Sequence, residues 1–182
     1  KTGLALAFVW GLAEATVFFV VPDVLISLVA ILRPKRAGKH VVAAIAGALL
    51  GGAMMFGWAV QDAAGARDAV VHVPFVRARM FAEVDAGYSQ HGLGAVYRGP
   101  LGGVPYKTYA VEAPKFVGRG AFLASTIPAR GYRFVVVWIA FGFAGGALRR
   151  YLKRTDARLL VWHGVFWIAL YAVYWGRILQ AH

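Results

Sequence analysis

The sequence predicts an all-α integral membrane protein with an inverted-topology repeat: two re-entrant helical hairpins and about three transmembrane helices. The chain has 182 residues, of which 60% are hydrophobic, whereas soluble domains have about 45–50%. Its mean hydropathy is +0.61. Two apolar segments carry charges at the same spacing, with acids at positions 14 and 23 and bases at positions 98 and 107. We expect a single membrane domain over residues 1–182.

The first repeat is expected over residues 1–60. Residues 4–32 are mostly apolar but are broken by Glu14 and by Pro22-Asp23. A straight crossing needs about 20 residues, so this segment suits two half-length helices better than one. Proline favours the break, and non-helical backbone at membrane depth needs protein or a wet cavity around it. We expect a re-entrant hairpin with its tip near Pro22; one long, kinked helix is the alternative.

A clean transmembrane span over residues 41–60 completes the first repeat. It carries Gly47 and Gly51, the spacing of small residues that lets two helices approach closely. We favour packing against another helix of the same chain over self-association, although a homo-oligomer remains open.

The second repeat is expected over residues 98–148, after an amphipathic linker of one or two interfacial helices at residues 61–97. Residues 99–118 are rich in glycine and proline and suit a second re-entrant segment. It would end in a short helix near residues 121–126. A span over residues 132–148 follows.

Charge and aromatic patterns orient the chain. Basic loops at residues 33–39 and 149–158 are expected to face the cytoplasm. The last span, residues 159–179, ends in an aromatic belt. The two hairpins then enter from opposite faces, as in secondary transporters whose broken helices meet at the midplane. Residues 1–15 resemble a cleavable signal peptide, but the apolar run that follows argues against cleavage.

Composition also excludes several classes of function. The net charge is +12, but many bases lie beside apolar spans, which indicates topology and anionic headgroups rather than nucleic acid. The chain has no cysteine, which excludes disulfides, thiolate metal sites and thiol nucleophiles. No catalytic motif is found, so we expect no enzyme, metal or cofactor.

The charges at membrane depth are the candidate site, because such residues are costly there. Glu14 and Asp23 are expected to lie near Arg98 and Lys107, where glycine-rich backbone and the two bases could bind a phosphate. Glu14, in apolar surroundings, could carry a proton, with Asp23 as a second candidate. A purely structural pairing of these acids and bases is the alternative.

Further charged residues occur in the second half of the chain. Arg130 and Arg133 either extend the phosphate path or, as we favour, anchor their span at the headgroups. Glu112 is a weaker candidate that could pair with Lys115 or Lys107. His163, inside the last span, is expected to be a hydrogen-bonded packing residue rather than a proton relay.

These features resemble the DedA/VTT superfamily, also called SNARE-associated Golgi protein-like. The residues that carry the resemblance are Glu14, Pro22-Asp23 with the run to Leu28, Arg98, Val104-Pro105-Tyr106-Lys107, Phe122-Leu123-Ala124-Ser125 and Arg133-Phe134. The resemblance implies movement of lipids across the bilayer, coupled in bacteria to the proton motive force. It also implies functional acids at Glu14 and Asp23 and a functional base at Arg98. Lys107 stands where many members carry arginine.

The expected function is therefore a flippase or scramblase for a phospholipid or a polyprenyl-phosphate in the bacterial inner membrane. Proton coupling is part of this expectation. The alternatives are a transporter of small ions or solutes and, less favoured, a membrane lipid phosphatase, for which no serine or histidine nucleophile accompanies the charges.

Overall fold

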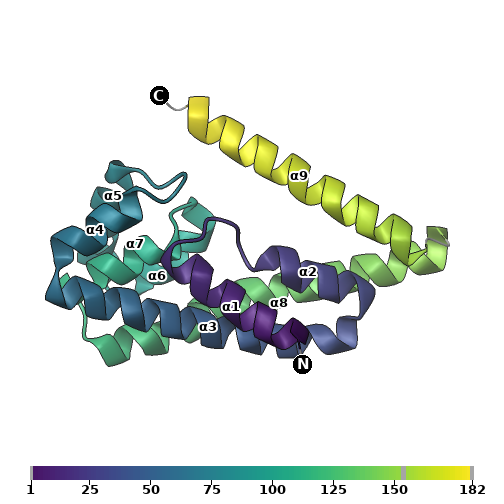
Figure 1. The fold of residues 1–182 in the computed structure, drawn as a ribbon, viewed down its shortest axis with the longest axis horizontal. Helices are drawn as coiled ribbons and strands as arrows, with labels where there is room; N and C mark the ends of the chain where they lie inside the picture. The colour runs from purple at the N-terminus through teal and green to yellow at the C-terminus, as the bar shows by residue number, and fades with distance from the viewer. Residues whose placement is uncertain (1, 153–154, 181–182) are drawn as a thin grey trace.

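The computed structural model describes residues 2–152 and 155–180 of the chain. Within these residues all regular structure is helical (Figure 1). The elements in order are α1 (Thr2–Thr16), α2 (Asp23–Leu32), α3 (Pro34–Gln61), α4 (Ala63–Val71), α5 (Ala78–His91), α6 (Gly94–Gly102), α7 (Tyr106–Glu112), a 3₁₀ turn (Ala113–Lys115), α8 (Arg119–Leu152) and α9 (Asp156–Gln180).

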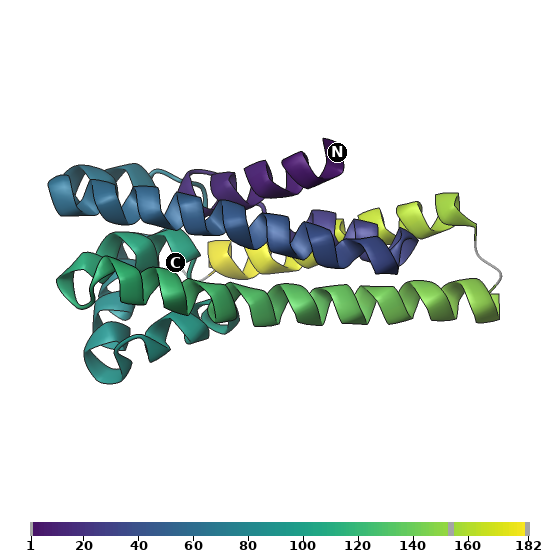
Figure 2. The same cartoon turned by 90° about the horizontal axis from the view of Figure 1, so that it is seen from below.

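Three of these helices, α3, α8 and α9, are long and apolar enough to span a membrane. They contain 28, 34 and 25 residues, so even the shortest extends about 38 Å, against about 30 Å for the hydrocarbon core of a bilayer. The described part of the chain is thus consistent with a multi-pass membrane protein. Figure 2 shows α3 and α8 lying along the long axis of the molecule.

The first apolar segment is interrupted between α1 and α2. Residues 17–22 are not helical, and the indole Nε1 of Trp10 donates a hydrogen bond to the carbonyl of Val20 inside this break (2.9 Å). Pro22 directly precedes α2. The expectation that residues 4–32 do not form one continuous helix is confirmed. We call residues 17–22 the first break.

A second interruption separates α6 from α7. Gly103 adopts a left-handed backbone with φ of 75°, which glycine tolerates readily, and Pro105 directly precedes α7. We call residues 103–105 the second break. Figures 1 and 2 place both breaks well inside the length of α3 and α8, away from the two ends of the molecule.

Small residues bring α1 and α3 together. A Cβ atom on Gly47 would clash with the backbone of Phe8, and one on Gly51 would clash with Ala15. In return, a Cβ atom on Gly11 would clash with the backbone of α3. The small-residue spacing therefore serves packing within this chain, as expected.

Three expected boundaries were wrong. The short helix at residues 121–126 and the span at 132–148 form one continuous helix, α8, with Pro128 inside it. Proline removes only one backbone donor from a helix, and within a membrane protein neighbouring helices can tolerate that loss. The basic loop at residues 33–39 is mostly the first turn of α3, because Pro34 suits the first helical position. Residue 98 lies inside α6 rather than at a boundary.

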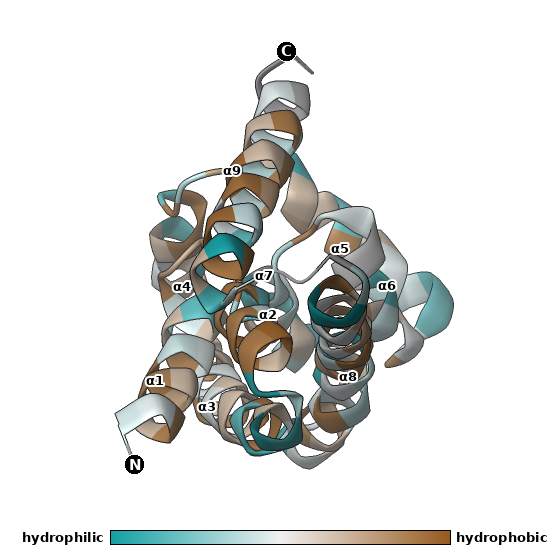
Figure 3. Ribbon diagram, turned by 90° about the vertical axis from the view of Figure 1, so that its right-hand side faces the viewer, coloured by the Kyte–Doolittle hydropathy of each residue, from teal (hydrophilic) through white to brown (hydrophobic). Residues whose placement is uncertain are grey.

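Helices α4 and α5 occupy the linker expected at residues 61–97. The turn between α2 and α3, the C-terminal end of α8 and the N-terminal end of α9 lie at the same end of the molecule (Figure 1). Residues 153 and 154 of the second basic segment lie outside the described residues. Figure 3 shows hydrophilic residues at the α2–α3 turn and hydrophobic residues along α9.

Candidate functional site

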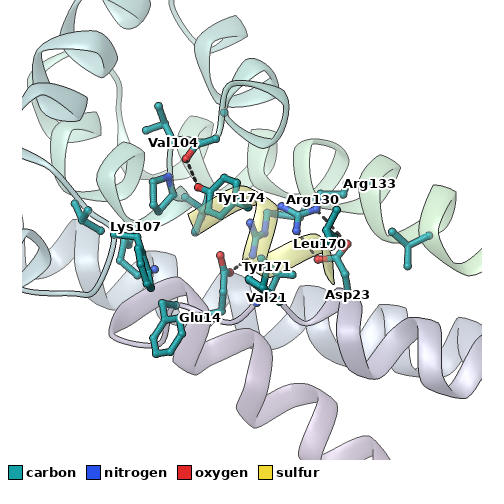
Figure 4. A pocket seen from close by; sticks show the side chains of 18 of the residues that line it. Glu14, Val21, Asp23, Val104, Lys107, Arg130, Arg133, Leu170, Tyr171 and Tyr174 are labelled. Carbon is teal, nitrogen blue, oxygen red and sulfur yellow. Dashed lines mark hydrogen bonds and ion pairs between the residues drawn. The ribbon is translucent and has the colours of Figure 1, made fainter. Parts of the chain in front are cut away.

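A cavity of about 450 Å³ lies where the two breaks approach α8 and α9. Five charged side chains line it, and Figure 4 shows them entering from α1, α2, α7 and α8. They are Glu14 at the end of α1, Asp23 at the start of α2, Lys107 in α7, and Arg130 and Arg133 in α8.

Glu14 and Arg130 form an ion pair that is almost completely buried. Their side chains are 5% and 2% exposed. The guanidinium of Arg130 also lies over the rings of Tyr106 and Phe134, 5.0 and 5.3 Å from the ring centroids. Its Nε is buried and has no hydrogen-bond partner among the described residues. One donor of this arginine is therefore unused inside the cavity wall.

Asp23 and Arg133 form a second pair with two parallel hydrogen bonds. The Nε and Nη2 atoms of Arg133 donate to Oδ1 and Oδ2 of Asp23 at 3.1 and 2.5 Å. This fork geometry holds a carboxylate more firmly than a single contact does. Asp23 is buried, whereas the side chain of Arg133 is 24% exposed. The second pair is thus more open than the first.

Lys107 is the fifth charge of the cavity and is 1% exposed. Its Nζ donates to the carbonyl oxygen of Phe18 in the first break, at 3.2 Å. An ammonium has three donors, and Lys107 also interacts electrostatically with Glu14. Two acids and three bases line the cavity, so fully ionised side chains leave a formal surplus of one positive charge.

Two tyrosines of α9 connect the breaks. The hydroxyl of Tyr171 accepts a hydrogen bond from the backbone N–H of Val21 (3.0 Å) in the first break. The hydroxyl of Tyr174 donates to the carbonyl of Gly103 (3.1 Å) in the second break. Because these tyrosines lie one turn apart on α9, a single helix face contacts both breaks and closes one side of the cavity.

The partners of the two acids match the prediction only in part. Glu14 and Asp23 form their ion pairs with Arg130 and Arg133, which was not expected. Lys107 shares the cavity with both acids and interacts electrostatically with Glu14, as expected, whereas the expected proximity to Arg98 was wrong. Arg98 does not line the cavity; it is exposed on α6, where its Nη1 contacts Nε2 of His91 at 2.6 Å. Val96 and Gly99 of α6 line the cavity, so Arg98 lies on another face of the same helix, whereas Lys107 in α7 is buried.

Headgroup anchoring, which the sequence favoured for Arg130 and Arg133, was wrong for Arg130, because that side chain is buried. The two arginines are three residues apart and therefore share one face of α8. This spacing, together with the two acids in the first half, was the available signal for the pairing.

Sequence reasoning missed the roles of the α9 side chains, which it assigned to an aromatic belt. His163 is a hydrogen-bonded packing residue, as expected: its Nε2 lies 2.8 Å from the hydroxyl of Ser27. The indole of Trp167 donates to the same hydroxyl (2.9 Å). This network joins α9 to α2 beside the cavity.

A second cluster of charges lies outside the cavity, among α4, α5 and α7. Glu112 is 1% exposed and contacts Arg67 (3.4 Å) and Lys115, and Lys115 also reaches Asp85 (3.2 Å). The pairing of Glu112 with Lys115 is confirmed. Because all four groups are engaged with one another, the cluster fastens these short helices together.

Comparisons with family models, with curated proteins and with solved structures give no significant match. The described residues contain no group of three or more His, Asp or Glu side chains that could hold a metal ion. The cavity and its charges are therefore the features of this chain that point to a function.

Proposed function

We propose that the chain is a membrane lipid transporter, a flippase or scramblase, whose substrate has a phosphate group, as in a phospholipid or a polyprenyl-phosphate. The observation that carries this proposal is the cavity with three bases and two acids inside an apolar helical protein. Arg130, Arg133 and Lys107 are the phosphate-binding residues in this proposal.

Charge balance is the physical reason. An uncompensated charge away from water is costly, so a buried surplus cation calls for an anion or for the loss of a proton. A lipid phosphate would supply that anion, and the unused Nε donor of Arg130 together with the free capacity of Lys107 could bind its oxygens. The same cavity would shield the headgroup from the hydrocarbon core during crossing.

The two breaks support a re-entrant, inverted arrangement. In this proposal α1–α2 and α6–α7 are hairpins that dip into the bilayer from opposite faces, and α3 and α8 are the corresponding crossing helices. Pro22 and Pro105 precede α2 and α7 at matching positions. Broken helices that meet near the midplane are a plan of secondary transporters.

Proton coupling belongs to the proposal as well. Glu14 is the principal proton carrier and Asp23 the second, since each is a carboxylate bonded to an arginine that the phosphate also needs. Protonation of Glu14 would release Arg130 toward the substrate, and departure of the substrate would return Arg130 to Glu14. Because the carboxylate of Glu14 and the lipid phosphate would compete for the guanidinium of Arg130, proton binding and lipid binding would be coupled.

Family and location complete the proposal. We propose membership of the DedA/VTT superfamily on the resemblance described above, and the bacterial inner membrane as the location. Among the charged residues that carry the resemblance, Glu14, Asp23, Lys107 and Arg133 line the cavity. Arg98 does not, and we leave it out of the proposed site.

Lipid exchange in vesicles tests the function. Purified protein is reconstituted into vesicles that contain head-labelled fluorescent phosphatidylglycerol, and an impermeant quencher in the outer solution reports movement between leaflets. We expect the protein to accelerate movement and Lys107→Gln to slow it at least tenfold, with Arg98→Gln as the matched control that keeps the rate.

Two results would contradict the proposal. Vesicles in which the protein moves no labelled lipid would exclude a flippase or scramblase for this lipid; if they pass small ions instead, the ion-transporter alternative holds. Release of inorganic phosphate from a lipid phosphate would indicate a phosphatase. If Arg98→Gln and Lys107→Gln slow lipid movement equally, the charges of the cavity do not explain the transport.

A further inference from the structure

The face of α8 that lines the cavity changes from charged to apolar along its length. Arg130, Arg133, Val137 and Phe141 all line the cavity and follow one another at intervals of three or four residues. This spacing puts them on a single face of the helix. The cavity therefore continues from its charges along α8 toward the end of the molecule where α2 is joined to α3.

The opposite wall is a stripe of α9. Phe166, Leu170 and Tyr174 are spaced four residues apart and also line the cavity. Their exposed fractions are 46%, 46% and 37%, so these side chains face the cavity and the outside of the molecule at once. The α9 wall of the cavity is therefore an accessible apolar edge, and α9 leans away from the other helices toward its C-terminal end (Figure 1).

The apolar part of the cavity is closed at its far end. The ring of Phe141 meets the ring of Phe166 edge to face, with centroids 5.3 Å apart, and the ring of Trp167 lies parallel to that of Phe141 at 6.4 Å. From Arg133 to Phe141 the helix rises about 12 Å. We call the space bounded by Val137, Phe141, Phe166 and Leu170 the apolar furrow.

We propose that the apolar furrow holds a hydrocarbon chain of the same molecule whose anionic group binds at Arg130 and Lys107. The substrate is then an anionic amphiphile that enters sideways from the bilayer. This inference rests on the proposed function and deepens it. Two features identify the occupant: the surplus positive charge at one end of the cavity and the partly exposed apolar side chains of its α9 wall at the other.

Shape, rather than hydrophobicity, gives the furrow its role. A lipid chain is already in an apolar medium, so its transfer into the furrow gains little from leaving water, and packing against the wall decides the fit. A bulky side chain placed in the furrow should therefore exclude the chain, whereas the same side chain on the lipid-facing surface should not.

The test uses Val137→Trp, with Val136→Trp as the matched control. Val136 is the neighbouring residue, is 60% exposed, and does not line the cavity. Leu170→Trp with Ile168→Trp, which is 72% exposed, repeats the comparison on α9 in case Val137→Trp fails to fold. Thermal unfolding in detergent identifies variants that fold like the wild type.

The readout is retention of dioleoyl phosphatidylglycerol by delipidated protein, measured by native mass spectrometry. We expect the furrow variants that fold to retain the lipid at least tenfold more weakly than the wild type, while both controls bind as the wild type does. Inorganic phosphate should displace the lipid far less effectively than a second phospholipid does.

The inference would be overturned if the folded furrow variants retained the lipid as well as the wild type does. It would also be overturned if the control variants lost as much lipid as the furrow variants. Displacement by inorganic phosphate as effective as that by phospholipid would show a free-anion site and would overturn it too. Retention is measured without transport. A wild type that moves no lipid in vesicles yet shows the expected retention pattern would refute the transport function and leave the furrow in place.

Discussion

Removing the positive charge of Arg130 should expose the energetic role of the buried pair. In Arg130→Gln, Glu14 keeps its carboxylate in a position only 4% exposed and loses its main partner. Breaking a buried pair on one side costs about 3–5 kcal/mol. Lys107 still interacts electrostatically with Glu14, so we expect the lower end, about 3 kcal/mol. For a chain of this size that corresponds to a fall of about 6–12 °C in melting temperature.

The double variant Glu14→Gln with Arg130→Gln shows how much of the lost stability comes from the unpaired charge and how much from altered packing. With both charges removed, no unpaired carboxylate remains, so the double variant should lose less stability than Arg130→Gln alone. Arg133→Gln is the comparison, and it should cost less than Arg130→Gln because its side chain is 24% exposed and water can reach the site.

The assay is thermal unfolding of purified protein in one detergent, followed by circular dichroism. An Arg130→Gln protein that melts within about 1 °C of the wild type would refute a buried pair at this site. A double variant that is less stable than the single variant would refute the pairing argument, because the loss would then come from packing around the two side chains.

Three further predictions follow from the same contacts. Glu14→Gln cannot titrate, so vesicles carrying it should lose acceleration by an imposed pH gradient yet keep slow lipid exchange; a full response to the gradient would remove Glu14 from the coupling. Gly47→Leu should destabilise the protein by about 1–3 kcal/mol through overpacking against α1, whereas Gly57→Leu, which meets nothing within 4 Å, should melt as the wild type does. Tyr174→Phe removes the hydrogen bond to the second break and should slow lipid exchange with a loss of about 1 kcal/mol in unfolding free energy; an unchanged exchange rate would argue against a role for this contact.

Local chemistry made much of the fold predictable. Long apolar runs gave the spanning helices, and Pro22 with its neighbouring acid marked the break between α1 and α2. The spacing of Gly47 and Gly51 indicated a close approach between α3 and another helix of the chain, which is α1. Each of these features depends on residues near one another in the chain, so the sequence itself contains the signal.

The partners in the site could not be predicted in the same way. Glu14 and Arg130 are 116 residues apart, and their pairing depends on how α8 packs against α2 and α3, the helix on which α1 lies. Charge symmetry between the two halves suggested Arg98, but α6 turns Val96 and Gly99 to the cavity and leaves Arg98 exposed outside it. Pro128 likewise suggested a boundary where tertiary packing sustains one helix.

The central claim is that a lipid phosphate occupies the charged cavity. The most direct measurement is electron cryomicroscopy of the protein in a lipid nanodisc that contains phosphatidylglycerol. We expect a lipid whose phosphate oxygens lie within about 3 Å of Lys107 Nζ and of the Arg130 guanidinium, with one chain between α8 and α9. A cavity that holds only water, or a lipid whose phosphate lies at the basic turns while Lys107 and Arg130 contact no anion, would contradict the account.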